Sequence, residues 1–152
     1  MGRLLAGRGD IAGAAAAFQV AIDSGNPEVA PAAAFNLGVL RAGQGDTAGA
    51  AAAYQLAIDS GHADAAPMAT RNLGRLLEKQ GDRAGAAVAY QLAIDSGHAD
   101  AAPTAALLLG MLREEQGDQA GAVAAYRLAI DSGHPEVAQK ALFNLRVLRG
   151  AG

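Results

Sequence analysis

The stretch Gly81 to Gln116, GDRAGAAVAYQLAIDSGHADAAPTAALLLGMLREEQ, decides the fold because close copies of it fill the chain. Its Gly-Asp start recurs every 36 residues without an insertion, first at Gly9 and last at Gly117. A gapless repeat of this length is typical of a stack in which each unit mainly contacts its neighbours. The sequence therefore predicts one repeat domain over residues 1–152, made of a partial helix at 1–8 and units at 9–44, 45–80, 81–116 and 117–152.

Each unit is expected to contain two antiparallel helices. In the second unit, Asp46 is a natural N-cap for a helix over residues 47–60, and Gly61 can end that helix. Pro67 suits the first turn of a second helix over residues 67–79. No segment alternates apolar and polar residues over a useful length, so we expect no sheet. The same pattern predicts helices at 11–24, 31–43, 83–96, 103–115, 119–132 and 136–149.

Composition excludes several classes of function. Alanine, glycine and leucine supply 40, 20 and 17 of the 152 residues, so a thick core of large side chains is excluded. The absence of cysteine excludes disulfides and thiol chemistry. A net charge of −3 argues against nucleic-acid binding, and no apolar run is long enough to span a membrane. Without a recognisable signal peptide we expect a cytoplasmic protein, and ten arginines against two lysines indicate the GC-rich coding of a bacterial source.

The repeat resembles the tetratricopeptide repeat and its Sel1-like relatives. The family counts its repeat from the helix with Leu-Gly, which is the second helix of each 36-residue unit above, and its signature places Ala, an aromatic residue and Ala on the helix that follows. Here Leu73-Gly74 is followed at the family's spacings by Ala86, Tyr90 and Ala93. The 36-residue unit and the Gly-His after the second helix are closer to the Sel1-like relatives. The resemblance implies an all-α fold, a right-handed α-solenoid of antiparallel helix pairs.

The last unit departs from this signature because Arg146 replaces the glycine. Glycine and alanine at such positions let paired helices approach closely. With no helix following, glycine is no longer required, and we expect Arg146 to face water.

The motif Asp-Ser-Gly-His contains the residue types of a hydrolytic triad and occurs at 59–62, 95–98 and 131–134. Neighbours in one connector rarely converge as a triad, so we interpret the motif as a helix C-terminus. The histidine would lie near the last carbonyls, where a cation is favoured, and Asp59 would bond to the next connector. Histidines separated by one helix-packing layer of about 10 Å cannot share one zinc ion. We therefore expect no enzyme, metal or cofactor.

The resemblance also implies that the first helices of the family's repeats, here 31–43, 67–79, 103–115 and 136–149, line a concave groove. One groove position in the family is often asparagine, which holds the backbone of an extended peptide, and the matching residues here are Asn36, Asn72, Leu108 and Asn144. We expect a protein or peptide partner, with an acidic segment opposite a basic middle. The alternative is that these asparagines only cap or hydrate a solvated helix face. The other expected groove residues are Phe35, Val39, Arg71, Arg75, Lys79 and Met111.

A second hypothesis is a structural, self-assembling solenoid. The segment at 1–8 is too short to be a stable helix alone, which would leave Phe18 and Ile22 poorly covered. Incomplete terminal repeats can stack on each other or pair around a two-fold axis and so form a homo-oligomer. A start partway through a repeat also fits an excised or engineered fragment of a longer array. At the other end, the residues without a following helix are Leu142, Leu145 and Leu148.

Overall fold

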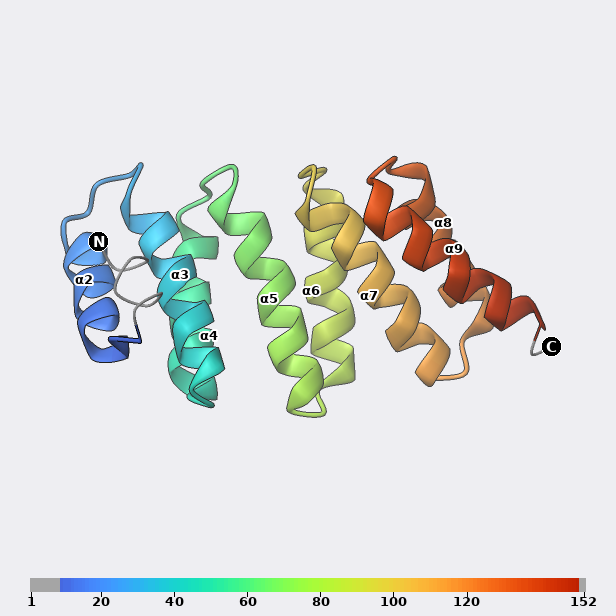
Figure 1. The fold of residues 1–152 in the computed structure, drawn as a ribbon, viewed down its shortest axis with the longest axis horizontal. Coiled ribbons are helices and arrows are strands. Elements are labelled where there is room, and N and C mark those ends of the chain that lie inside the picture. Colours follow the sequence, from blue (N-terminus) through green and yellow to red (C-terminus); the bar gives the residue numbers. More distant parts are fainter. Residues whose placement is uncertain (1–8, 151–152) are drawn as a thin grey trace. The chain divides into compact units, whose positions relative to one another are not determined.

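The computed structural model describes residues 9–150, which form eight α-helices and no strand. The expected partial helix at 1–8 lies outside the described residues. Successive helices run antiparallel and are joined by short connectors (Figure 1). All eight predicted helices are confirmed, with ends within two residues of the expected positions. Their bounds are α2 Ile11–Asp23, α3 Ala30–Gly43, α4 Thr47–Asp59, α5 Ala65–Lys79, α6 Arg83–Asp95, α7 Ala101–Glu115, α8 Gln119–Asp131 and α9 Pro135–Gly150.

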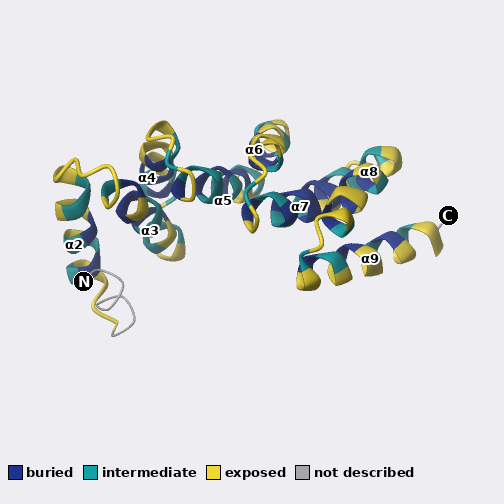
Figure 2. Ribbon diagram, turned by 90° about the horizontal axis from the view of Figure 1, so that it is seen from above, coloured by how far each residue is buried: buried dark blue, intermediate teal, exposed yellow. Residues whose placement is uncertain are grey.

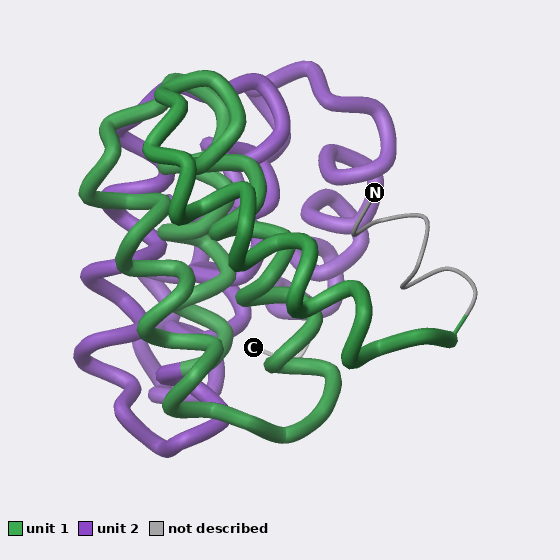
Figure 3. The backbone as a smooth tube through the Cα atoms, turned by 90° about the vertical axis from the view of Figure 1, so that its left-hand side faces the viewer, with its two compact units in different colours: residues 1–76 green, residues 77–152 purple. Residues whose placement is uncertain are grey.

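The chain divides into two compact units, residues 1–76 and 77–152, and the division falls inside α5 (Figure 3). In the first unit α3 packs against α2 and α4, and in the second α7 packs against α6, α8 and α9. Buried residues lie on the helix sides that face a neighbour, whereas the connectors are largely exposed (Figure 2). Each unit therefore has an alanine-rich core of its own.

Glycine on the first helix of a repeat lets the tyrosine of the second helix pack against its backbone. A Cβ atom added at Gly38 would lie 2.5 Å from Cδ1 of Tyr54, and one at Gly110 would lie 2.5 Å from Cδ1 of Tyr126. Both tyrosines are buried, so their rings have little room to move away. The close approach expected from the Leu-Gly pair is thus confirmed. Arg146, which replaces this glycine in the last helix, is exposed as predicted.

The aspartates that precede α2, α4, α6 and α8 are N-caps, as predicted. Each accepts a hydrogen bond from the backbone N–H three residues later, for example at 2.9 Å from Gly49 to Asp46. At Asp118 the backbone hydrogen bond from Gly121 lowers the pKa of the carboxyl, and Arg113, 2.9 Å away, adds to this effect. The full set of caps is Asp10, Asp46, Asp82 and Asp118.

The Asp-Ser-Gly-His connector caps two helices, and the role predicted for its histidine was wrong. Ser60 donates from Oγ to the carbonyl of Ala57 at 2.6 Å and accepts from the backbone N–H of His62. Nδ1 of His62 accepts from the N–H groups of Asp64 and Ala65, both at 3.3 Å. The histidine therefore caps the start of α5 as a hydrogen-bond acceptor. This cap explains why α5 begins two residues before the predicted position.

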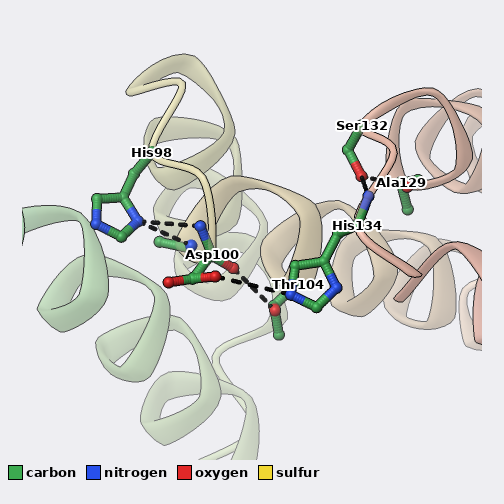
Figure 4. Close-up of polar contacts among 7 residues, drawn as sticks. His98, Asp100, Thr104, Ala129, Ser132 and His134 are labelled. Carbon is green, nitrogen blue, oxygen red and sulfur yellow. Dashed lines mark hydrogen bonds and ion pairs between the residues drawn. The ribbon is translucent and has the colours of Figure 1, made fainter. Parts of the chain in front are cut away.

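Figure 4 shows the same connector in the second unit. Nδ1 of His98 accepts from two backbone N–H groups, at 3.2 and 3.1 Å. His134 directs its Nε2 atom toward the carboxylate of Asp100, 3.7 Å away. Asp59, which we expected to reach the next connector, accepts from Gln55 of its own helix at 2.7 Å. Asp100 is thus a carboxylate that does reach the following connector.

Candidate functional site

In the first unit, several expected groove residues gather around Tyr54 of α4. The ring of Phe35, on α3, has its centroid 6.2 Å from that of Tyr54. Burial raises the pKa of the Tyr54 hydroxyl, while a hydrogen bond to Asn72 and the charges of Arg75 and Arg71 lower it. We call these five residues the Tyr54 site. It combines an aromatic pair with two positive charges from α5.

The asparagine of the Tyr54 site has partners within the fold. Its Oδ1 atom accepts from the Arg71 guanidinium at 3.3 and 3.2 Å, and its side chain also hydrogen-bonds Tyr54. A peptide that used Asn72 would have to replace these bonds. Arg75 is exposed and Val39 is 44% exposed, so these two side chains are the more accessible ones.

In the second unit, a pocket of about 470 Å³ is formed by α7, α8 and α9. It is lined by Met111, Glu114, Glu115, Tyr126 and Asn144, and we call it the Tyr126 pocket. The Tyr126 hydroxyl donates to Oε2 of Glu114 at 2.7 Å. Burial raises the pKa of Tyr126, the hydrogen bond and charge of Glu114 raise it further, and a hydrogen bond with Asn144 opposes them. The fold thus brings together two expected groove residues, Met111 and Asn144.

Comparison of the sequence with models of known families identifies the family of this chain. A family model described as "Tetratricopeptide repeat" matches residues 1–67 and 71–141. The chain belongs to the tetratricopeptide repeat family. This membership indicates a protein-interaction scaffold. A search of curated proteins gave no match.

Two solved structures share the α-solenoid fold of this tetratricopeptide array. The crystal structure of BtubC (BKLC) from P. vanneervenii has a TM-score of 0.82 at 18% identity, covering 99% of this chain and 69% of that chain. The crystal structure of MamA has a TM-score of 0.71 at 17% identity, covering 99% and 93% of the two chains. At such identities the likeness is evidence for the fold alone. Among the helices of residues 9–150, none combines the length and apolar character that crossing a membrane requires.

Some of the expected groove residues lie outside both the Tyr54 site and the Tyr126 pocket. Asn36 is half-buried, and Lys79 is exposed at the end of α5. Tyr90 donates to Oε2 of Glu78 at 2.6 Å, which repeats the bond of the Tyr126 pocket one repeat earlier. The tyrosine and glutamate roles were missed from the sequence. Their only signal is a Glu-to-Tyr spacing of twelve residues that occurs twice.

The residues expected to mediate self-association of the array require a correction. Phe18 is only 7% exposed and Leu145 only 5%, because both pack into apolar clusters of their own units. Ile22 and Leu148 are half-buried against the same kind of cluster. Only Leu142 is exposed. Its exposed apolar neighbours on α9 are Phe143, at 66%, and Val147, at 49%.

Proposed function

We propose that this tetratricopeptide array is a non-catalytic interaction module of the Sel1-like type. It binds extended segments of a partner protein on the helices that carry the expected groove residues, α3 and α5 in the first unit and α7 and α9 in the second. The observation that carries the proposal is the Tyr54 site, where the exposed guanidinium of Arg75 lies beside an aromatic pair. Its proposed location is the cytoplasm of a bacterium.

The chemistry of the Tyr54 site favours an acidic segment. Arginine presents several N–H donors in a fixed plane and binds carboxylates more specifically than lysine does. Ala42 occupies the position that Glu78 and Glu114 occupy in later repeats, so the Tyr54 site lacks their carboxylate. A carboxylate of the partner would therefore meet positive charge without competition from that position. An apolar neighbour in the same segment would contact Phe35 and Val39.

Binding of short peptides to the full chain tests this proposal. One panel of extended peptides places Asp and Glu between apolar residues, and a second panel replaces every Asp and Glu with Asn and Gln. We expect the acidic panel alone to bind. The double substitution Arg71→Glu and Arg75→Glu should weaken that binding at least about tenfold, since it reverses two charges at the site.

A charge reversal elsewhere provides the control. Arg127 is exposed on α8, outside the Tyr54 site, so Arg127→Glu should leave peptide affinity nearly unchanged. Circular dichroism should report the same helix content for all variants. Equal binding of the neutral panel, or undiminished binding by the double variant, would contradict the proposal.

The exposed apolar side chains of α9 favour a second candidate function, self-association. Leu142, Phe143 and Val147 are all exposed, and Phe143 and Val147 are one helical turn apart. Exposed apolar surface often marks an interface between proteins. Two copies could pair these helices around a two-fold axis. Light scattering over a wide concentration range should then give a mass that rises above the monomer and falls again in the Phe143→Glu variant. A constant monomer mass would exclude this candidate.

A further inference from the structure

The Tyr126 pocket differs in charge from the Tyr54 site. Two of its five lining residues, Glu114 and Glu115, are carboxylates, and none is a cation. Glu114 accepts the Tyr126 proton in a hydrogen bond of 2.7 Å, but a neutral phenol leaves the negative charge of the carboxylate in place. Glu115 faces Arg83 at 3.7 Å, where both side chains are about half exposed, so water weakens that pair. The pocket therefore keeps a net negative charge.

The polar atoms available in the pocket are acceptors. The Tyr126 hydroxyl has one hydrogen atom, and it points to Glu114 in their hydrogen bond. In the hydrogen bond between Tyr126 and Asn144, the donor is therefore the Asn144 amide. This arrangement leaves the Asn144 amide oxygen as an acceptor, beside the two carboxylates. A ligand group that fits must consequently supply donors and positive charge together.

The wall of the pocket is suited to an apolar stem. Met111 is 42% exposed, and its thioether side chain is unbranched and adaptable. Arginine combines an apolar stem of methylene groups with a planar head of five donors, which matches an apolar wall and several separated acceptors. A lysine ammonium offers only three donors from one point.

We propose that the Tyr126 pocket binds the guanidinium side chain of an arginine in a partner segment. The inference rests on the proposed function, because it assumes that the array binds segments of other proteins. Carboxylates of Glu114 and Glu115 pair with the guanidinium, the Asn144 oxygen accepts a further hydrogen bond, and Met111 covers the stem. The second unit thus selects a basic residue, in contrast to the acidic segment selected by the first.

Two matched peptides test the inference with the full chain. One is an acetylated, amidated pentapeptide with a central arginine between alanines, and its twin carries citrulline, which has nearly the same shape but no charge. Affinity is measured by calorimetry at low salt, and backbone amide shifts are followed by NMR. We expect the arginine peptide to bind at least about fivefold more tightly, because only it carries a charge opposite to the pocket. Its shifts should centre on Met111, Glu115 and Asn144.

Variants separate the pocket from a general effect of negative charge. Glu114→Gln keeps an acceptor for Tyr126 but removes the charge, and should abolish the preference for arginine over citrulline. Glu78→Gln makes the same change at the equivalent bond to Tyr90, outside the pocket, and should preserve the preference. Arg83→Gln should raise the affinity for the arginine peptide about twofold, because it releases Glu115 from its weak pair.

The outcomes distinguish this inference from the proposed function. Equal affinity for the arginine and citrulline peptides would overturn the inference. So would an equal loss of the preference for arginine in the Glu114→Gln and Glu78→Gln variants. If the acidic panel still bound through Arg71 and Arg75, the proposed function would stand without it. If neither the acidic panel nor the arginine peptide bound, both would be overturned.

Discussion

The Tyr54 site and the Tyr126 pocket occupy equivalent places in their repeats but have opposite chemistry. In each, a buried tyrosine packs on a glycine of the preceding helix and hydrogen-bonds an asparagine of the following one. The first unit adds Arg71 and Arg75, whereas the second adds Glu114 and Glu115. A repeat can therefore keep its packing frame constant while a few neighbouring side chains reverse the charge that a partner meets.

The constant part of the comparison is the glycine contact. Gly38→Ala and Gly110→Ala should each lower the free energy of unfolding by about 2–3 kcal/mol, since the new Cβ would lie 2.5 Å from a buried tyrosine carbon. Urea denaturation of the full chain measures both losses.

Gly43→Ala is the matched control for these substitutions. Gly43 is also helical, but a Cβ there meets no atom within 4 Å, so its replacement should leave stability unchanged or slightly higher. Losses that differ strongly between Gly38→Ala and Gly110→Ala would show that the two units do not share one packing frame.

The variable part of the comparison is the partner of the tyrosine hydroxyl. Tyr126→Phe leaves Glu114 without its donor and should cost about 1.5–2 kcal/mol, because hydrogen bonds to charged groups are the stronger ones. Tyr54→Phe removes a bond to a neutral amide and should cost less than about 1 kcal/mol. Thermal and urea unfolding should both show the larger loss for Tyr126→Phe. A larger loss for Tyr54→Phe would show that the bond to Glu114 is not the stronger of the two.

Alkaline pH should reveal a smaller difference between the same two tyrosines. Both have a raised pKa, so folding favours the neutral phenol, and Tyr126 has the added effect of the Glu114 charge. The stabilisation is complete below the unfolded pKa of about 10 and is lost as pH rises, by up to about 1.4 kcal/mol per pH unit for each residue. Tyr126→Phe should therefore flatten the alkaline loss of stability more than Tyr54→Phe.

The phenolate absorbance provides an independent measurement of this pH effect. The chain has three tyrosines and no tryptophan, so the signal is uncomplicated. Tyr126 should ionise at a higher pH than Tyr54 in the folded protein. Ionisation of Tyr126 first would show that the Arg71 and Arg75 charges do not lower the pKa of Tyr54 as the geometry indicates.

The sequence was sufficient for features that depend on neighbours along the chain. The 36-residue period, the helices and the aspartate caps follow from local spacing, because a helix places residues three and four apart on one face. The family resemblance also named Met111 and Asn144 together as expected groove residues, and the structure places both in one pocket. The bond between Asp59 and Gln55 could not be predicted, because an acid at a helix end has several partners within reach.

Tertiary packing alone decided which side chains meet across helices. Whether Phe18 and Leu145 are buried and whether Tyr126 bonds Glu114 depend on the distance and rotation between packed helices. A period in the sequence places a residue on a face of its own helix, but it does not set where the facing helix puts its atoms. For this protein the sequence by itself therefore determined the repeat frame, and the packed structure decided the charge and hydrogen-bonding of each site.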